Sequence, residues 1–167
     1  MVQKAPRFLA DAMLGSVARK LRIFGFDTLY IAHAPDDEVL KTGIEQCRVI
    51  LTADKELFKR AVKAGAAGVF VSGEGEVDDI VHILAKNGVA SIRPDGISSR
   101  CSVCNGLLEE RALEQVRNCI PDKVAECHSE FYQCASCGKV YWEGGHLRRI
   151  RALARAVDSK LGTATVS

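Results

Sequence analysis

The chain has 167 residues, of which 47% are hydrophobic and 26% are charged, and its formal net charge is +2. These values are average for a soluble globular protein. No apolar run reaches the roughly 18–20 residues that a membrane span needs, and the N-terminus shows no signal-peptide pattern. The composition therefore argues against a membrane or secreted protein, and we expect a cytoplasmic one.

Strand and helix patterns alternate from residue 7 to residue 88. Short apolar runs predict strands over residues 7–11, 28–31, 48–52 and 68–72. Apolar residues at helical spacing predict helices over residues 13–23, from residue 35 onward, over 55–64 and over 77–87. Because such alternation builds parallel sheets, we expect an α/β fold with helices on the faces of a parallel sheet.

The character of the sequence changes after a predicted boundary at residues 94–96. Two Cys-x2-Cys pairs, each typical of a tight metal-binding turn, supply four thiolates for structural zinc: Cys101, Cys104, Cys134 and Cys137. Around them we expect short strands, a helix over residues 108–116, a last strand over 139–142 and a basic helix over 146–157. The predicted organisation is a first domain over 1–95, a zinc-ribbon domain over 96–157 and a disordered tail over 158–167.

Three of the seven cysteines lie outside these pairs. Four cysteines at metal-type spacing indicate a protein of a reducing compartment and argue against a scaffold held by disulfides. Cys47 precedes an apolar strand and is expected to be a small buried core residue. Cys119 and Cys127 lie between the two pairs and could compete for metal, although neither belongs to a Cys-x2-Cys turn.

The positive charge is concentrated near the C-terminus. Residues 1–95 hold 13 Lys and Arg against 13 Asp and Glu, whereas residues 139–155 hold five basic residues against Glu143 alone. A positive patch of this kind favours an anionic partner such as nucleic acid. The alternative is a solvated helix face, and the charge pattern alone favours neither.

Acidic residues follow three of the predicted strands. Asp11 ends the first strand, Asp36 and Asp37 lie in the connection after the second, and Asp54 follows the third. The carboxyl ends of parallel strands share one edge of the sheet, where ligands bind. Clustered carboxylates favour Mg²⁺ or Mn²⁺, which can activate water for attack on a phosphodiester. The alternative for Asp36, Asp37 and Asp54 is capping of the helices that they precede.

Taken together, these motifs resemble the Mut7-C family. The first unit carries the resemblance in FLADAMLG at 8–15, ARKLRIFGFDT at 18–28, DDE at 36–38 and LTAD at 51–54. The second unit carries it in RCSVCN at 100–105 and CASCGKVYWEGGH at 134–146. The similarity covers residues 7–150 and keeps the order of the motifs.

The resemblance implies a PIN-like nuclease domain fused to a C-terminal zinc ribbon, with RNA as the substrate. It also implies that Asp11, Asp36 or Asp37, and Asp54 bind the catalytic metal. The family commonly has an arginine immediately before the third of these aspartates. This chain has Ala53 there, so one positive charge near the expected site is missing.

Four arginines are candidates for substrate binding. Arg19 and Arg22 lie three residues apart on the first predicted helix, where they could clamp a phosphate or belong to a solvated face. Arg148 and Arg149 lie on the basic helix near the C-terminus.

The first functional interpretation is a metal-dependent endoribonuclease that cuts single-stranded RNA. One alternative is a non-catalytic zinc-ribbon module that binds RNA or protein and has a degenerate acidic site. Another is a nuclease that acts on DNA or from chain ends. The intact acidic positions favour the first interpretation over the second, whereas no residue visibly reads a 2′-hydroxyl, so the sequence does not choose between RNA and DNA.

Overall fold

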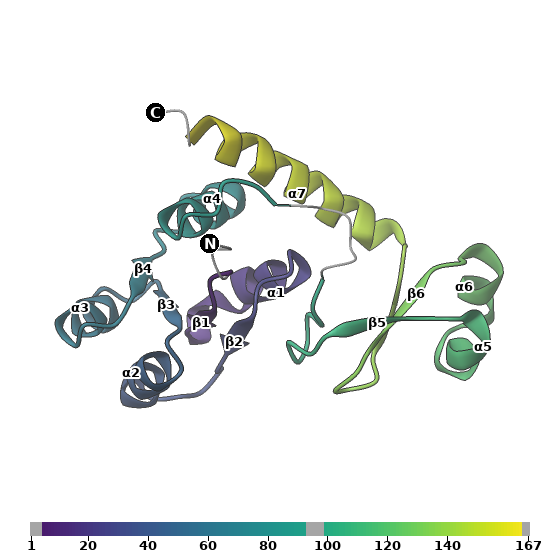
Figure 1. The fold of residues 1–167 in the computed structure, drawn as a ribbon, viewed down its shortest axis with the longest axis horizontal. Helices are drawn as coiled ribbons and strands as arrows, with labels where there is room; N and C mark the ends of the chain where they lie inside the picture. The colour runs from purple at the N-terminus through teal and green to yellow at the C-terminus, as the bar shows by residue number, and fades with distance from the viewer. Residues whose placement is uncertain (1–4, 93–98, 165–167) are drawn as a thin grey trace.

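The parallel sheet predicted from the sequence is confirmed. A computed structural model describes residues 5–92 and 99–164, and we call residues 5–92 the N-terminal unit. Its strands are β1 (Phe8–Ala10), β2 (Thr28–Tyr30), β3 (Val49–Thr52) and β4 (Gly68–Phe70). They pair in parallel in the order β2-β1-β3-β4, and the protein has the expected α/β fold (Figure 1).

Helices cover both faces of this sheet. One face packs against α1 (Gly15–Ile23) and α4 (Glu76–Lys86), and the other against α2 (Asp36–Glu45) and α3 (Lys55–Lys63). The central strand β1 is buried from both sides, which is why it is a continuous apolar run instead of an alternating one. Phe8 belongs to the first of these cores and Leu9 to the second.

The last helix, α7 (Gly145–Ala164), is longer than predicted. We expected it to end near residue 157 and the tail from 158 to be disordered, but the helix continues to Ala164. Its length is explained by Ala154, Val157 and Leu161, which recur at helical spacing and are buried in the core of the N-terminal unit. Residues 165–167 of the predicted tail lie outside the described residues.

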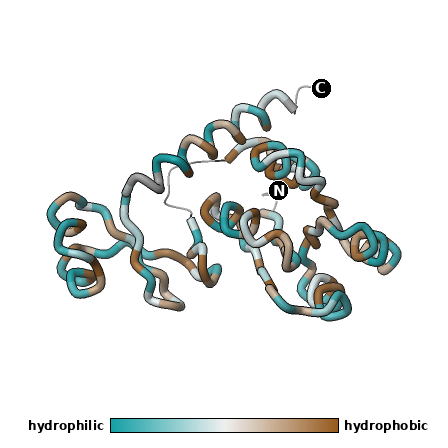
Figure 2. Tube along the Cα trace, turned by 180° about the vertical axis from the view of Figure 1, so that it is seen from behind, coloured by the Kyte–Doolittle hydropathy of each residue, from teal (hydrophilic) through white to brown (hydrophobic). Residues whose placement is uncertain are grey.

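The helix α7 also joins two parts of the structure that the sequence assigned to different domains. It begins after the second sheet and then runs back along α4 (Figure 1). Polar and apolar residues alternate along it, as Figure 2 shows. Lys160 on α7 pairs with Asp78 on α4 at 2.6 Å. The predicted zinc-ribbon domain therefore contributes a helix to the core of the first unit.

The second sheet is antiparallel and lies in residues 99–144, which we call the cysteine module. Its strands are β5 (Leu108–Arg111), β6 (Phe131–Cys134) and β7 (Val140–Trp142), paired in that order. Between β5 and β6 the chain forms α5 (Leu113–Val116), the 3₁₀ helix η2 (Arg117–Cys119) and α6 (Asp122–Cys127). Val116, Ile120 and Phe131 form a small core there.

Two local predictions are wrong. The helix expected over residues 108–116 is a strand in its first half, because Leu108 and Arg111 pair with Cys134 and Phe131 of β6. Cys47 is exposed and has a positive φ of 50° in the turn that follows α2. The predicted domain boundary at residues 94–96 lies outside the described residues.

A buried ion pair connects the starts of the strands. Arg48 is only 7% exposed, and its guanidinium donates to the Asp27 carboxylate at 2.8 Å and to the Phe8 carbonyl at 3.2 Å. Asn105 of the cysteine module donates to the same Asp27 carboxylate at 2.8 Å. Burial opposes ionisation of Asp27, but the hydrogen bonds from Arg48 and Asn105 outweigh it, so the pKa of this carboxyl is lowered.

Replacing this carboxylate should make stability less dependent on pH. A carboxyl with a lowered pKa stabilises the fold above its unfolded pKa of about 3.9, and this contribution is lost as the pH falls through the folded value. We expect Asp27→Asn to cost about 1–3 kcal/mol at pH 7, because buried Arg48 loses its ionic partner. In urea unfolding, the difference from wild type should shrink below about pH 4.

The exposed carboxylate of Asp122, paired with Arg117, offers a matched control. Asp122→Asn should change the free energy of unfolding by less than about 0.5 kcal/mol at every pH. A loss at Asp27 that is as large at pH 3 as at pH 7 would contradict the assignment.

Candidate functional site

Asp11 lies directly after β1 and its carboxylate is held on both sides. It is 6% exposed. Its Oδ1 accepts from the backbone amide of Met13 at 3.0 Å, which caps the 3₁₀ helix η1 (Ala12–Leu14). Its Oδ2 accepts from the hydroxyl of Thr52. These bonds offset the cost of burying the charge and fix the plane of the carboxylate.

Thr52 links Asp11 to Asp54. The fully buried hydroxyl of Thr52, at the end of β3, donates to Asp11 and accepts from the Asp54 amide at 2.9 Å. Asp54 in turn caps α3, since its Oδ1 accepts from the amides of Glu56 at 2.7 Å and Leu57 at 3.1 Å. The structure therefore joins Asp11 and Asp54 across neighbouring strands, and Asp54 also has the capping role considered from the sequence.

Thr52 was not among the site residues predicted from the sequence. A signal for it was present, because Thr52 is a hydroxyl residue that ends an otherwise apolar strand, two residues before an aspartate. Residues of this kind bond readily to nearby backbone and carboxylate groups.

Asp36 and Asp37 form a second pair at the start of α2. Since β1, β2 and β3 are parallel, the connection that carries them lies at the same edge of the sheet as Asp11 and Asp54. Both bind Arg60 of α3: Asp36 at 3.1 Å, and Asp37 through the second guanidinium nitrogen. Their side chains are 47% and 88% exposed, so Asp36 is the more enclosed of the two.

The four aspartates do not form a ready-made metal cage. Among residues 5–92 and 99–164, the one group of His, Cys, Asp or Glu side chains that converges closely enough to hold an ion is the set of four cysteines. The acidic residues are instead arranged as two pairs at a shared edge. A catalytic ion at this edge therefore stays a prediction.

The predicted substrate-binding arginines differ in their surroundings. Arg19 is exposed on α1. Arg22 is only 5% exposed, and burial lowers the pKa of its guanidinium. It donates to the carbonyls of Thr28 at 2.8 Å and of Ser102 and Val103 at 3.0 Å. Arg22 is thus turned inward and binds the cysteine module, so the predicted phosphate contact is not possible in this conformation.

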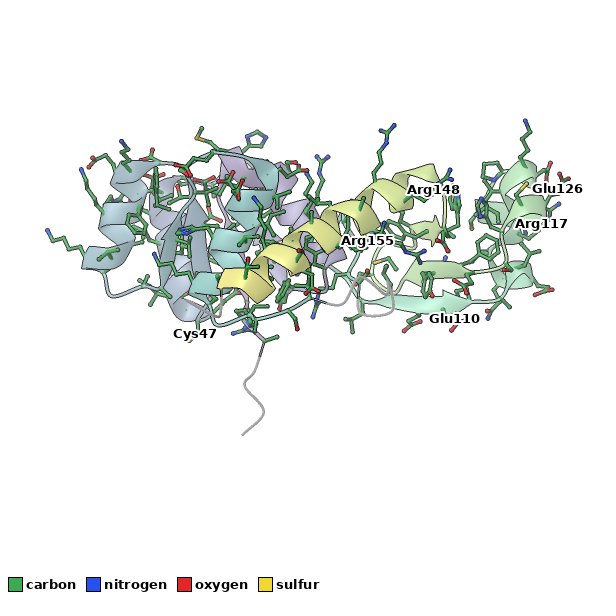
Figure 3. All side chains as sticks on the ribbon, turned by 90° about the horizontal axis from the view of Figure 1, so that it is seen from above. Cys47, Glu110, Arg117, Glu126, Arg148 and Arg155 are labelled. Carbon is green, nitrogen blue, oxygen red and sulfur yellow. The ribbon has the colours of Figure 1, made fainter. Side chains whose placement is uncertain are left out.

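The N-terminal part of α7 carries the other two arginines. Arg148 and Arg149 are exposed, as is Arg155 further along the helix. Figure 3 shows Arg148 near the start of α7 and Arg155 near its middle. Arg151 differs from them because it pairs with Glu143. The exposed arginines make this helix the basic surface that the sequence indicated.

The four predicted cysteine ligands converge on one point. Their sulfur atoms all lie within 4.8 Å of one another, with 3.6 Å from Cys101 to Cys137 and 3.4 Å from Cys104 to Cys134. A tetrahedral zinc ion with bonds of about 2.3 Å separates its sulfurs by about 3.8 Å. A Cβ atom at Gly106 would lie 2.7 Å from the Cys134 sulfur, so only glycine lets the backbone pass this close. The donor set and its spacing fit zinc.

Two thiols of this site, those of Cys101 and Cys104, have pKa values shifted in opposite directions. Burial raises the pKa of the Cys101 thiol, but hydrogen bonds from the Tyr141 hydroxyl and the backbone amides of Cys104 and Val103 outweigh it and lower the value to about 6. A backbone hydrogen bond from Gly106 favours ionisation of Cys104, but burial and the neighbouring thiols raise its pKa to about 12. A metal that binds all four as thiolates must therefore displace protons.

The remaining cysteines of the module stand apart from this group. Cys119 in η2 and Cys127 in α6 are both exposed and are not members of the cluster. The Tyr141 hydroxyl, which was not predicted to belong to this site, lies 3.0 Å from the Cys101 sulfur.

Comparison with known protein families finds a match over most of the chain. The family model described as "Mut7-C RNAse domain" matches residues 6–154. No curated protein and no solved structure matches the chain significantly. Within the described residues, no helix combines the length and apolarity needed to cross a membrane.

The link through Thr52 can be tested with a nearly isosteric change. Thr52→Val removes the hydroxyl that binds Asp11 and Asp54 but keeps the shape of the side chain. We expect a loss of about 1–3 kcal/mol in the free energy of unfolding, because a buried carboxylate oxygen and an amide lose their partner. Urea unfolding measures it. Thr163→Val, at an exposed site on α7, should change stability by less than about 0.5 kcal/mol. Equal effects would contradict the link.

Removal of one ligand should release the metal from the cysteine module. We expect Cys104→Ser to lose bound zinc in elemental analysis and to lose β-sheet circular dichroism from this module, because its small core does not hold the fold alone. Cys119→Ser should keep both signals. Retention of stoichiometric, tightly bound zinc in Cys104→Ser would show that the four thiolates are not the ligand set.

Proposed function

Because the chain belongs to the Mut7-C RNAse domain family, we propose that it is a metal-dependent endoribonuclease that hydrolyses phosphodiester bonds of single-stranded RNA. The family supports a nuclease function with RNA as the substrate. The observation that carries the proposal within this chain is that Thr52 bonds both the Asp11 carboxylate and the Asp54 backbone amide, which places these two aspartates at the same edge of a parallel sheet.

The proposed catalytic residues are Asp11, Asp54 and Asp36 or Asp37. Their carboxylate oxygens are the hard donors that Mg²⁺ and Mn²⁺ prefer. A bound ion of this kind supplies activated water and stabilises the charge that develops on the phosphodiester. Asp11 is the best-held ligand candidate, since Thr52 and the Met13 amide fix both of its oxygens. Asp36 is favoured over Asp37 because it is more enclosed.

The proposed architecture is a PIN-like domain followed by a zinc ribbon. We assign the PIN-like domain to residues 1–95 and the ribbon to residues that follow, with Zn²⁺ as the structural ion of Cys101, Cys104, Cys134 and Cys137. The core contacts of α7 support one modification, in which this helix completes the PIN-like domain. The cysteine usage supports a reducing compartment, and we propose the cytoplasm.

The proposed RNA contacts are Arg19, Arg148 and Arg149. All three are exposed, and arginine binds phosphate well because its planar guanidinium offers several donors. Arg22 is left out because its guanidinium is buried between the two units.

The pairing of Asp36 and Asp37 with Arg60 favours a second candidate. Carboxylates that are already neutralised by an arginine of the same chain have less need of a metal ion. In this alternative the acidic edge is degenerate, and the protein binds RNA through α7 and the cysteine module without cutting it.

The two candidates predict different outcomes for one substrate. A circular single-stranded RNA has no ends, so its conversion to a linear product reports endonucleolytic cleavage. We expect cleavage with Mn²⁺ or Mg²⁺, none with a chelator, and a loss of about 100-fold or more in Asp11→Asn, because charge stabilisation at the scissile phosphate is removed.

Glu126→Gln changes an exposed carboxyl on α6 and should cleave like wild type. Binding of the circular RNA without cleavage under any metal condition would favour the second candidate. Cleavage of a circular DNA of the same sequence at an equal rate would show that the enzyme does not select RNA.

A further inference from the structure

The two cysteine turns share a backbone conformation but differ in the residue that follows the second cysteine, Asn105 in one and Gly138 in the other. The residue after each Cys-x2-Cys pair has a positive φ, 69° at Asn105 and 75° at Gly138. In both turns its amide donates to the carbonyl of the first cysteine at 2.9 Å. Glycine is the usual residue for this conformation, and asparagine is among the few others that adopt it. Asn105 therefore keeps the turn while adding a side chain that Gly138 lacks.

The side chain of Asn105 reaches the N-terminal unit. Its Oδ1 accepts from the backbone amide of Thr28 at 3.0 Å, and its Nδ2 donates to the Asp27 carboxylate at 2.8 Å. Thr28 is the first residue of β2 and is fully buried. The carbonyl of Asp27 accepts from the amide of Phe8, the first residue of β1, at 2.8 Å. The side-chain amide of Asn105 thus binds the segment at which β2 begins and which also pairs with the first residue of β1.

Arg22 makes the reciprocal contact. Its buried guanidinium donates both to the Thr28 carbonyl and to the carbonyls of Ser102 and Val103, which lie between the first two cysteines. Its own carbonyl accepts from the Arg100 amide at 2.8 Å. A buried guanidinium needs these acceptors, and two of them belong to the backbone of the cysteine turn, so their placement depends on the shape of that turn.

We infer that the first cysteine turn is a metal-dependent latch on the N-terminal unit, so that zinc at the four cysteines orders the beginning of β1 and β2 through Asn105 and Arg22. The inference rests on the proposed zinc ion but not on nuclease activity. The latch acts at the edge of the sheet where strands begin, whereas Asp11 and Asp54 lie where strands end. Its effect is therefore on the order of the sheet and not on direct contact with substrate.

Hydrogen exchange of the full-length protein, resolved by NMR at the Thr28 and Phe8 amides, tests this latch. In zinc-loaded wild type both amides should be protected. Asn105→Gly keeps the left-handed turn and removes the side chain, and it should speed exchange at Thr28 by about tenfold while zinc content stays at one per chain. Gly138→Asn adds the same side chain to the other turn, where nothing lies within 4 Å of a Cβ, and should leave Thr28 unchanged.

Removal of zinc from wild type with a chelator should speed exchange at both amides by at least the same factor, and return of Zn²⁺ should reverse it. Unchanged protection at Thr28 in zinc-loaded Asn105→Gly would overturn the latch. Unchanged protection after zinc removal would overturn its dependence on metal. Neither result depends on RNA cleavage, so failure of this inference is distinct from failure of the proposed function.

Discussion

The structure depends on the hydrogen bonds that the buried guanidinium of Arg22 makes with backbone carbonyls. Arg22 sits at the end of α1 with its guanidinium almost closed to water, and a charge in that position is tolerated only when oxygen acceptors surround it. One acceptor comes from β2 and two from the first cysteine turn. The N-terminal unit therefore contains a group whose requirements are met by a segment 80 residues away in sequence. These hydrogen bonds attach the cysteine module directly to the N-terminal unit, in addition to the covalent connection between them.

The two edges of the parallel sheet carry different hydrogen-bond networks. Where the strands begin, Asp27, Arg48 and Asn105 form a network that holds the sheet and the cysteine module together. Where they end, Asp11 and Asp54 are held by local bonds through Thr52. Parallel strands make this separation automatic, because all of them begin at one edge and end at the other. The network of Asp27, Arg48 and Asn105 therefore lies at the opposite edge of the sheet from Asp11 and Asp54.

The sequence was most informative where a repeating physical pattern existed. Apolar runs alternating with amphipathic helices indicated the parallel sheet, and Cys-x2-Cys spacing indicated the cluster of four sulfurs, which the structure confirms. It was least informative about side-chain direction. Arg19 and Arg22 look equivalent in sequence, yet a helix turns by about 100° per residue and only Arg22 faces inward.

Pairing between distant segments was the second source of error. The residues Leu108–Arg111 have good helix propensity, but β6 offers a strand partner, and tertiary pairing overrides a local preference. The polar end of α7 looked like a tail because its burial depends on α4, which is remote in sequence. The link through Thr52 needed knowledge that β1 and β3 are neighbours, which no local pattern contains.

The position of α7 also bears on the order of events during synthesis. Protein domains usually fold from the N-terminus as the chain leaves the ribosome. Here Ala154, Val157 and Leu161 belong to the same core as Ile80, Ile83 and Leu84, so the early part of the protein emerges with an incomplete interior. Its packing is finished only after α7, which follows the whole cysteine module in sequence, has also been synthesised. For a protein proposed to cut RNA, the acidic edge is thereby carried on an incompletely packed unit until the cysteine module and α7 have been made.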